Sequence, residues 1–383
     1  MAIVFSQALS ESDVLNAFNN NIVKFDSDNA SPAVKAKITI GSVDVIITPD
    51  PSGEFTYNFK TFFKTLLNTN NFEDGIVNEV FADDMTPQYV YEDTNLYQSI
   101  SVTYEVTLES GSTESTSKTY NVTRSLLQLE DYRKGHRIAS QSLSLMLPFN
   151  EPGANNIFHV TYFEGYPFDL PLWSDAARSI EIRHQGTGLT TNLNVVKGIN
   201  RIYLSNGSIN WSFDDILPLH VGVNHIRIRI TGLTSQEMNV YITKKQGECG
   251  TLLKWFNQSG GWCYYLFNTH NEERKVKSLG TFNNSAKNLE NTVEDVVNLG
   301  SASEDEIEVF YSSATPEEKR LINTIFDSPK IYRFLPDPFQ NAQEADWVAE
   351  RIKQGTFETY NKNNTTFEDS FTIEKAERYK MTF

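Results

Sequence analysis

The chain has little cysteine, few histidines and no long hydrophobic run, and each shortage removes a class of protein. Its 383 residues include two cysteines, Cys249 and Cys263, which are too few for a disulfide-stapled scaffold. We expect reduced, buried thiols; a disulfide stays open as the alternative, because the two residues flank one predicted hairpin. No segment has the roughly 20 apolar residues of a membrane helix, and Met1–Phe5 lacks the features of a signal peptide. We therefore expect a protein that is made in the cytoplasm, is not exported by the usual route and does not insert into a membrane.

Positive charge is also scarce. Lysine and arginine together number 33 against 49 acidic residues, which gives a net charge of −16. Nucleic-acid binders need clustered basic side chains to displace counterions from phosphates, and anionic membrane surfaces attract the same residues. The composition therefore argues against both partners and favours a soluble protein.

Catalytic and metal-binding motifs are missing. None of the six histidines falls in a short metal-ligand spacing, although His184, His220 and His225 could still converge in space. The sequence contains no nucleophile elbow, phosphate-binding loop or dinucleotide-binding glycine pattern. The acidic pairs Asp26–Asp28 and Asp83–Asp84 do not match a calcium loop. We therefore predict no catalytic residue, no cofactor and no metal ligand.

What the sequence does have is the alternation of β-strands. Apolar and polar residues alternate in Val34–Ile40, Ile100–Leu108 and His225–Ile230, as in strands with one buried face. The polar stretch Glu109–Lys118 is predicted to be a mobile hairpin tip that reaches solvent or a neighbouring subunit. Near the C-terminus, the stretch from Thr315 to Glu318 combines an N-cap, a proline and a glutamate, which predicts a helix over 316–326.

These patterns predict a mainly β protein with two β-sandwich-like domains followed by a smaller α+β C-terminal domain. The predicted boundaries are 1–134, 135–275 and 276–383, and the second domain is expected to be jelly-roll-like and to end in an aromatic hairpin. Within the last domain, Ser285–Leu299 is predicted to be helical or mixed, and Gly355–Tyr360 to be a strand.

The aromatic hairpin, Thr251–Phe267, is the most distinctive segment. Two apolar strands flank a polar turn that contains two glycines, which can supply the positive φ of a tight hairpin. Large side chains on both faces suggest burial on both, or burial on one and a partner on the other. We predict that the hairpin holds the middle domain to the last one. The predicted structural or interface residues are Trp255, Phe256, Gly260, Gly261, Trp262 and Tyr264.

The hairpin sequence resembles that of tail or baseplate proteins of tailed phages infecting Bacteroidetes-type bacteria. The resemblance lies in Lys254-Trp255, in Gly260-Gly261-Trp262 and in the run Tyr264–Phe267, and it is extended by Phe18–Phe25 and Tyr162–Asp169. Cys263 departs from the acidic or polar residue expected there. The resemblance implies a non-enzymatic virion structural protein of the tail tip, baseplate or connector. It implies assembly with copies of itself, as a ring or another symmetric oligomer, and with other tail proteins, in the host cytoplasm.

Two other functions remain as hypotheses. A carbohydrate- or receptor-binding tail protein would attach to a host surface glycan through an exposed aromatic platform, with Trp173 and Trp211 as the candidates. A glycoside hydrolase would need two carboxylates in one cleft, and the candidates are Glu164 with Asp169, or Asp214-Asp215. We rank the structural protein first and the hydrolase last.

Overall fold

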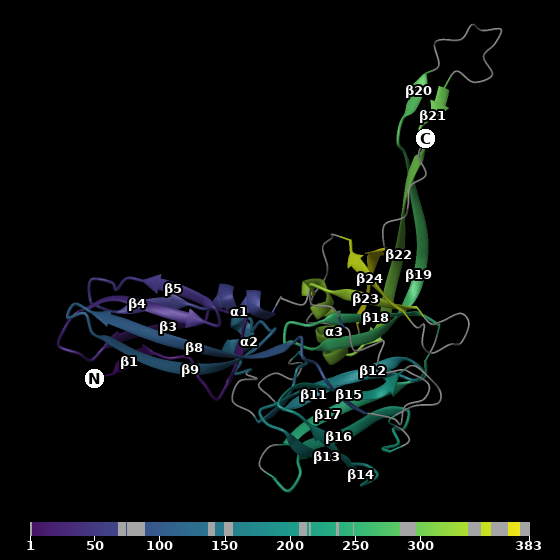
Figure 1. The fold of residues 1–383 in the computed structure, drawn as a ribbon. Coiled ribbons are helices and arrows are strands. Elements are labelled where there is room, and N and C mark those ends of the chain that lie inside the picture. The colour runs from purple at the N-terminus through teal and green to yellow at the C-terminus, as the bar shows by residue number, and fades with distance from the viewer. Residues whose placement is uncertain are drawn as a thin grey trace. The chain divides into compact units, whose positions relative to one another are not determined.

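β-Strands dominate the structure, a computed structural model, and short helices occur between them (Figure 1). It describes residues 2–67, 74, 89–136, 142–148, 156–206, 213, 216–234, 237–247, 249–283, 296–335, 346–353 and 367–375. The predicted fold class is confirmed: the chain is mainly β, with several β-sheet domains and a small C-terminal region that contains a helix.

The chain divides into two compact units. The first comprises Met1–Gln246 and Asn257–Cys263, and the second comprises Gly247–Phe256 and Tyr264–Phe383. The tip of the aromatic hairpin therefore belongs to the first unit and most of its two strands to the second. This division differs from the predicted domain boundaries at 134/135 and 275/276, which stay predictions.

The N-terminal part of the first unit is a β-sandwich. A three-stranded sheet has the order β1-β3-β6 and a five-stranded sheet the order β2-β9-β8-β4-β5. The strands are β1 (Ile3–Gln7), β2 (Val14–Asn16), β3 (Ile22–Ser27), β4 (Ala33–Ile40), β5 (Val43–Ile47), β6 (Phe55–Asn58), β8 (Tyr97–Leu108) and β9 (Thr113–Thr123). Helix α1 (Lys60–Leu67) follows β6 and buries Phe63 and Leu67.

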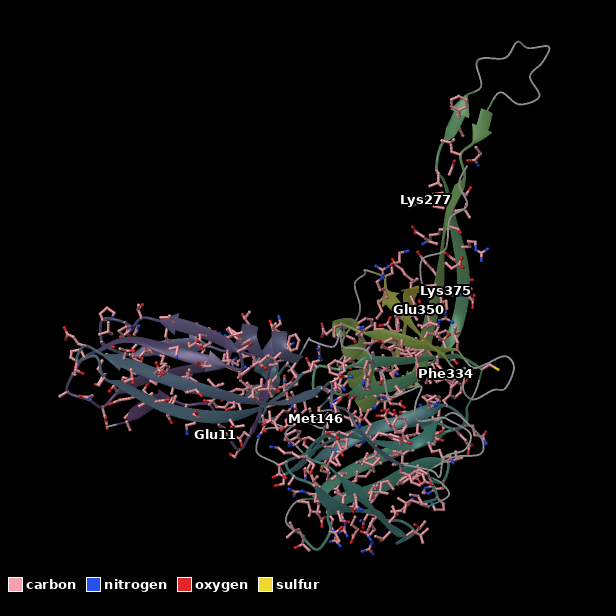
Figure 2. The ribbon with its side chains drawn as sticks, viewed as in Figure 1. Glu11, Met146, Lys277, Phe334, Glu350 and Lys375 are labelled. Atoms are coloured by element: carbon pink, nitrogen blue, oxygen red, sulfur yellow. The ribbon has the colours of Figure 1, made fainter. Side chains whose placement is uncertain are left out.

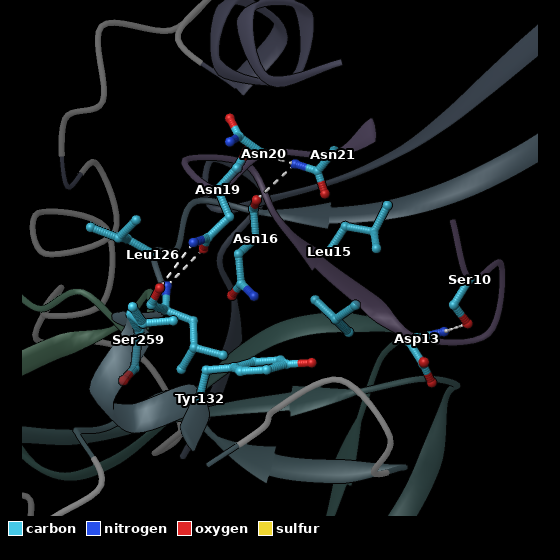
Figure 3. A pocket seen from close by; sticks show the side chains of 13 residues that line it. Ser10, Asp13, Leu15, Asn16, Asn19, Asn20, Asn21, Leu126, Tyr132 and Ser259 are labelled. Carbon is cyan, nitrogen blue, oxygen red and sulfur yellow. Dashed lines mark hydrogen bonds between the residues drawn. The ribbon is translucent and has the colours of Figure 1, made fainter. Parts of the chain in front are cut away.

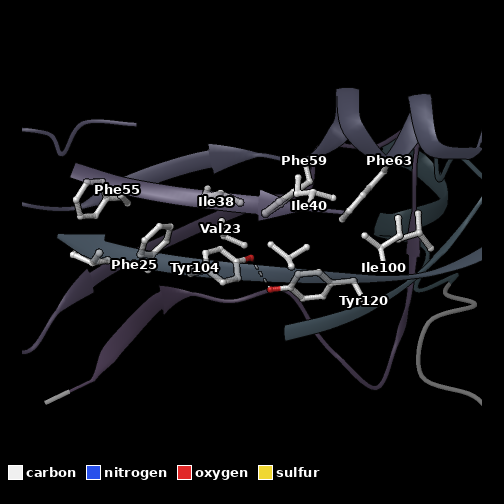
Figure 4. Close-up of a cluster of buried hydrophobic side chains, with 14 of the residues drawn as sticks. Val23, Phe25, Ile38, Ile40, Phe55, Phe59, Phe63, Ile100, Tyr104 and Tyr120 are labelled. Atoms are coloured by element: carbon white, nitrogen blue, oxygen red, sulfur yellow. Dashed lines mark hydrogen bonds between the residues drawn. The ribbon is translucent and has the colours of Figure 1, made fainter. Parts of the chain in front are cut away.

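Side chains from both sheets enclose one aromatic core (Figure 4). Phe25 of β3 stacks on Phe55 of β6 with ring centroids 5.4 Å apart, and its ring meets the edge of Tyr104 of β8 at 5.2 Å. The hydroxyls of Tyr104 and Tyr120 are hydrogen-bonded at 2.9 Å. Because buried polar groups are costly when unpaired, this bond lets two tyrosines occupy a core position. The alternation predicted in β4 and β8 produces this core.

The bounds predicted for the hairpin tip, Glu109–Lys118, are wrong. Strand β9 resumes at Thr113 and pairs with β8 from Thr107↔Thr113 to Tyr97↔Thr123, so only a short turn joins the strands. Backbone pairing needs no apolar side chains, and the polar residues here alternate along a strand with a solvated face.

The rest of the first unit contains two more sheets. One has the order β10-β12-β15-β7 and the other the order β11-β17-β16-β13-β14. Their strands are β7 (Val90–Glu92), β10 (Leu143–Leu145), β11 (Ile157–Phe163), β12 (Pro167–Ser174), β13 (Arg178–His184), β14 (Thr190–Val195), β15 (Gly198–Asn206), β16 (Gly222–Ile230) and β17 (Glu237–Lys245). Helix α2 (Leu129–Arg133) precedes them in sequence, apart from β7.

The second unit is built on a closed barrel with the order β18-β19-β22-β25-β24-β23. Its strands are β18 (Thr251–Phe256), β19 (Trp262–Ser278), β22 (Ser301–Ala314), β23 (Ile331–Leu335), β24 (Asp346–Ile352) and β25 (Phe367–Glu374). Helix α3 (Pro316–Asn323) begins where predicted: Thr315 Oγ1 accepts from the Glu318 amide at 3.2 Å, and the Glu318 side chain accepts from the Thr315 amide at 3.0 Å. A 3₁₀ turn (Thr324–Asp327) continues it.

Strands β19 and β22 extend beyond the barrel as a two-stranded ribbon, which we call the arm and define as residues 271–283 and 296–305 (Figure 1). Strands β20 (Thr281–Asn283) and β21 (Val296–Asn298) continue the ladder. Of the segment predicted to be helical or mixed, 285–299, residues 296–298 form a strand and no helix. Residues 284–295 and the strand predicted at 355–360 lie outside the described residues.

Candidate functional site

The first unit contains a pocket of about 450 Å³ beside strand β2 (Figure 3). One side is formed by residues 13–16 and the loop that follows, up to Asn21. The other side is formed by Leu126, Leu127 and, on helix α2, Leu129 and Tyr132. Ser10 and Ser259 complete the described part of the lining. The volume lies within the roughly 300–1,000 Å³ typical of small-molecule sites.

Backbone pairing holds the two sides together. Strand β2 runs parallel to the end of β9 with Asn16 opposite Thr123, and the amide of Ala17 donates to the Thr123 carbonyl at 3.1 Å. The Asn19 side chain forms two hydrogen bonds to the backbone of Leu127. Its Oδ1 accepts from the Leu127 amide at 2.8 Å, and its Nδ2 donates to the Leu127 carbonyl at 2.9 Å. The pocket therefore has a defined shape, set by residues more than a hundred positions apart.

Some side-chain amide groups of the asparagines around the pocket are hydrogen-bonded within the protein, and others are not. Asn21 is buried, and its Nδ2 donates to the Asn16 carbonyl at 3.0 Å. Asn16 Oδ1 accepts from Ser125 Oγ at 2.6 Å, and Asn20 Oδ1 accepts from Asn58 Nδ2 at 3.1 Å. Within the described residues, the Nδ2 groups of Asn16 and Asn20 donate to no protein acceptor. Two amide donors are therefore left for a ligand.

The remaining lining is apolar on one side and carries one charge. Leu129 and Tyr132 are 63% and 53% exposed. Asp13 is the one charged residue among the described residues of the lining, and its carboxylate accepts no hydrogen bond from the part of the chain that the structure describes. Figure 3 shows the Tyr132 ring below Asn16, with Asp13 at one end of the pocket and Ser259 at the other. Donors, one acceptor and an apolar surface suit the binding of a polar ligand.

The sequence did not reveal this pocket. The asparagine run Asn19–Asn21 is the local feature of the sequence that belongs to it. The pairing of β2 with β9 brings residues 126–132 to this run, and periodicity within either segment cannot predict that pairing.

The six hairpin residues predicted as an interface are placed as follows. The side chains of Trp255, Phe256, Trp262 and Tyr264 are all buried. In the second unit, the Trp255 indole donates to Thr324 Oγ1 at 2.9 Å. Gly260 adopts a φ of 96°, as the turn requires. The predicted role of the hairpin in joining two domains stays a prediction.

The hairpin turn is packed tightly within the first unit. Asn257 is fully buried; its Nδ2 donates to the Met146 carbonyl at 3.1 Å and its Oδ1 accepts from the Ser259 amide at 2.7 Å. A Cβ on Gly261 would lie 2.3 Å from the Met146 carbonyl oxygen and 2.5 Å from Cγ of Pro171. Only glycine fits at position 261.

The predicted sugar platform at Trp173 is wrong in its premise, because the ring is 1% exposed. It packs edge to face with Tyr97 at a centroid distance of 5.0 Å, as a core residue of β12. A buried ring cannot stack on a sugar. The second candidate, Trp211, lies outside the described residues, as does the acidic pair Asp214-Asp215.

The carboxylates Glu164 and Asp169 do not share an open cleft. The Glu164 side chain is 51% exposed and pairs with Lys244 at 3.0 Å. Asp169 is buried and forms two bonds to the Arg201 guanidinium, at 3.2 and 2.7 Å. Arg201 also binds Asp74 at 2.6 Å. Asp169 therefore neutralises the buried charge of Arg201. The one sign of this ion pair in the sequence is an arginine within the largely apolar strand β15.

A further carboxyl lies near this ion-pair cluster. Asp93 is 4% exposed, and burial raises its pKa to about 6, against the lowering influence of Arg201. The carboxyl of Asp93 therefore gains its proton more easily in the folded chain than in the unfolded one.

Neither cysteine forms a disulfide. Cys263 is buried as expected; burial raises the pKa of its thiol, and its sulfur accepts from Asn257 Nδ2 at 3.2 Å. Cys249 is exposed, which corrects the expectation of two buried thiols.

The histidines converge only in part. The rings of His184 and His220 lie 5.6 Å apart, whereas His225 stacks on Tyr241 at 4.5 Å. Asn224, which contacts His184, and His225 are neighbours in a strand and so face opposite sides. Among the residues the structure describes, no group of three or more histidine, cysteine or acidic side chains is placed to hold a metal. In the same residues, no helix is long and apolar enough to cross a bilayer.

Comparison with known proteins gives weak likenesses. No protein-family model and no curated protein matches the chain. Among solved structures, the fibronectin(III)-like modules of Clostridium thermocellum CbhA are 9% identical, with 64% of this chain and 94% of that chain covered and a TM-score of 0.21. A 1.5-MDa bacterial ice-binding adhesin is 8% identical over 79% of this chain and 88% of that one, with a TM-score of 0.18. A Ca²⁺-stabilized adhesin of an Antarctic bacterium is 7% identical over 98% of each chain, with a TM-score of 0.19. Likenesses at these TM-scores carry no argument about function.

Proposed function

We propose that this chain is a non-enzymatic structural protein of a phage tail, and that it assembles with further copies of itself through the arm. The resemblance of the aromatic hairpin supports the tail setting, at the tail tip, baseplate or connector of the virion. The arm is the observation that carries the proposal of self-assembly.

In the part of the chain that the structure describes, the arm consists of two strands. Strand β19 pairs with β22 from Ser278↔Ser301 down to Asn268↔Phe310, and within the described residues 271–278 pair with no other strand. Every residue from Asn271 to Leu279 is exposed. Ion pairs across the ladder, such as Arg274 with Asp305 at 2.7 Å, stabilise it modestly. An isolated two-stranded ribbon is marginally stable in water.

The exposed apolar side chains of the arm strengthen the case. They are Val276, Leu279, Phe282 and Leu299, which are 62%, 43%, 59% and 42% exposed. Burying one such side chain fully contributes about 1.5–3 kcal/mol. Figure 2 shows the side chains along the arm, including Lys277, projecting from the two-stranded ribbon. Association would bury these groups and give the strand edges a partner.

The partner we propose is a second copy of the chain, in a closed symmetric oligomer. A net charge of −16 disfavours indiscriminate association, so a specific surface has to provide the contact. Other tail proteins would then bind the assembled oligomer.

The test is the mass of the purified full chain by analytical ultracentrifugation, together with negative-stain electron microscopy. We expect a discrete oligomer, and we expect Val276→Asp with Phe282→Asp to lower its mass, because charges would be buried at the contact. The matched control is Val221→Asp with Leu233→Asp, two residues of the first unit that are 60% and 47% exposed; it should leave the mass unchanged. A wild-type monomer, or an arm variant of unchanged mass, would contradict the proposal.

A further inference from the structure

We propose that the pocket beside β2 binds a neutral saccharide unit. This inference does not rest on the arm or on the phage-tail proposal. It rests on the chemistry of the two sides of the pocket. One side is polar and suits the hydroxyls at the edge of a sugar ring, and the other is apolar and suits its C–H face.

The polar side matches hydroxyl groups. Asn16 Nδ2 and Asn20 Nδ2 donate to no acceptor among the described residues, and the Asp13 carboxylate accepts from no described donor. A hydroxyl can donate one hydrogen bond and accept two. The hydroxyls of a saccharide can therefore accept from the Asn16 amide and donate to the Asp13 carboxylate, whereas a ligand with acceptors alone would place its lone pairs against Asp13.

The opposite side is apolar. The Tyr132 ring and Leu129 lie on one helix, and each is more than half exposed. Aromatic side chains with one wet edge commonly pack against the apolar surface of a ligand, and the C–H face of a pyranose ring is such a surface. Tyr132 lies across the pocket from Asn16 in Figure 3, so a sugar ring could pack on Tyr132 while one of its hydroxyls reaches the Asn16 amide.

The charge of the lining selects among ligands. Among the described residues, neither lysine nor arginine lines the pocket, so a phosphate, sulfate or acidic sugar would find no cationic partner in this lining. Asp13 would repel it. A divalent cation prefers six or more oxygen ligands, and the described lining offers one carboxylate. An uncharged, hydroxyl-rich ligand fits best.

The experiment is isothermal titration of the full chain with maltose, cellobiose, lactose and chitobiose, and with sialyllactose as the acidic comparison. We expect at least one neutral disaccharide to bind and sialyllactose to bind more weakly than lactose. Tyr132→Ala and Asp13→Ala should each weaken binding about tenfold, the effect of losing one packed ring face or one charge-assisted hydrogen bond. Arg133→Ala, an exposed residue of the same helix that does not line the pocket, should bind as the wild type does.

Thermal melts of all three variants show whether each is folded, and Asp13→Asn serves as a second, isosteric variant if Asp13→Ala is not. The proposal is overturned if none of the four neutral disaccharides binds. It is also overturned if folded Tyr132→Ala and Asp13 variants bind as tightly as the wild type, or if sialyllactose binds more tightly than lactose.

Discussion

Replacing Gly261 with alanine should destabilise the first unit sharply. The added Cβ would lie 2.3 Å from the Met146 carbonyl oxygen and 2.5 and 2.8 Å from two carbons of the Pro171 ring. Atoms in contact usually lie about 3.5–4.0 Å apart, so the turn has to move by about 1 Å. Neither obstacle can rotate away, because one is backbone and the other a closed ring. Overpacking typically costs about 1–3 kcal/mol, and we expect the upper end of that range.

The matched control is Gly165→Ala. Gly165 has a φ of 82°, and nothing lies within 4 Å of an added Cβ. The substitution should therefore lower the free energy of unfolding by about 1 kcal/mol, because alanine disfavours the left-handed backbone conformation. Urea unfolding measures both losses. Hydrogen exchange locates the first, because peptides containing 143–147 and 257–263 should lose protection while those of 316–335 keep theirs. If Gly261→Ala were no less stable than Gly165→Ala, the described packing of the turn would be refuted.

Two further predictions concern local stability and pH. Thr315→Ala should lower the free energy of unfolding of the second unit by about 1 kcal/mol, because it removes the capping box; Ser in the same place should restore most of it in a urea titration. For Asp93, the folded pKa of about 6 lies above the unfolded value of 3.8. The free energy of unfolding is therefore highest, as far as Asp93 determines it, below about pH 4. It falls by about 3 kcal/mol as the pH rises from 4 through 6, because the folded chain must then hold a buried carboxylate. The stability of Asp93→Asn relative to the wild type should accordingly rise between pH 4 and 7. A difference in the free energy of unfolding that stays constant over this pH range would contradict the prediction.

Local patterns in the sequence predicted local structure well. The alternation in β4 and β16 and the capping residues at Thr315 each act within a few positions, and each element forms where predicted. The fold class follows from the same signals, because repeated half-buried strands need facing sheets.

Long-range pairing could not be predicted in the same way. The pocket depends on Asn16 lying opposite Thr123, and the ion-pair cluster depends on Arg201 meeting Asp169 and Asp74. Such contacts are chosen by the packing of whole sheets and leave no mark in periodicity. The expectation of an exposed Trp173 failed for a related reason: a tryptophan beside polar residues can be core or surface, and its sheet partners decide which.

The path of the chain through the hairpin has a consequence for synthesis on the ribosome. The first unit includes Asn257–Cys263, which follow six residues of β18 that belong to the second unit. When residue 246 leaves the exit tunnel, the nascent first unit still lacks the segment that fills the space beside Met146 and Pro171. N-terminal domains usually fold first during translation, but this unit can complete its core only after residues 257–263 have been synthesised. A fragment cut at residue 246 would therefore keep its strands and lack part of its core.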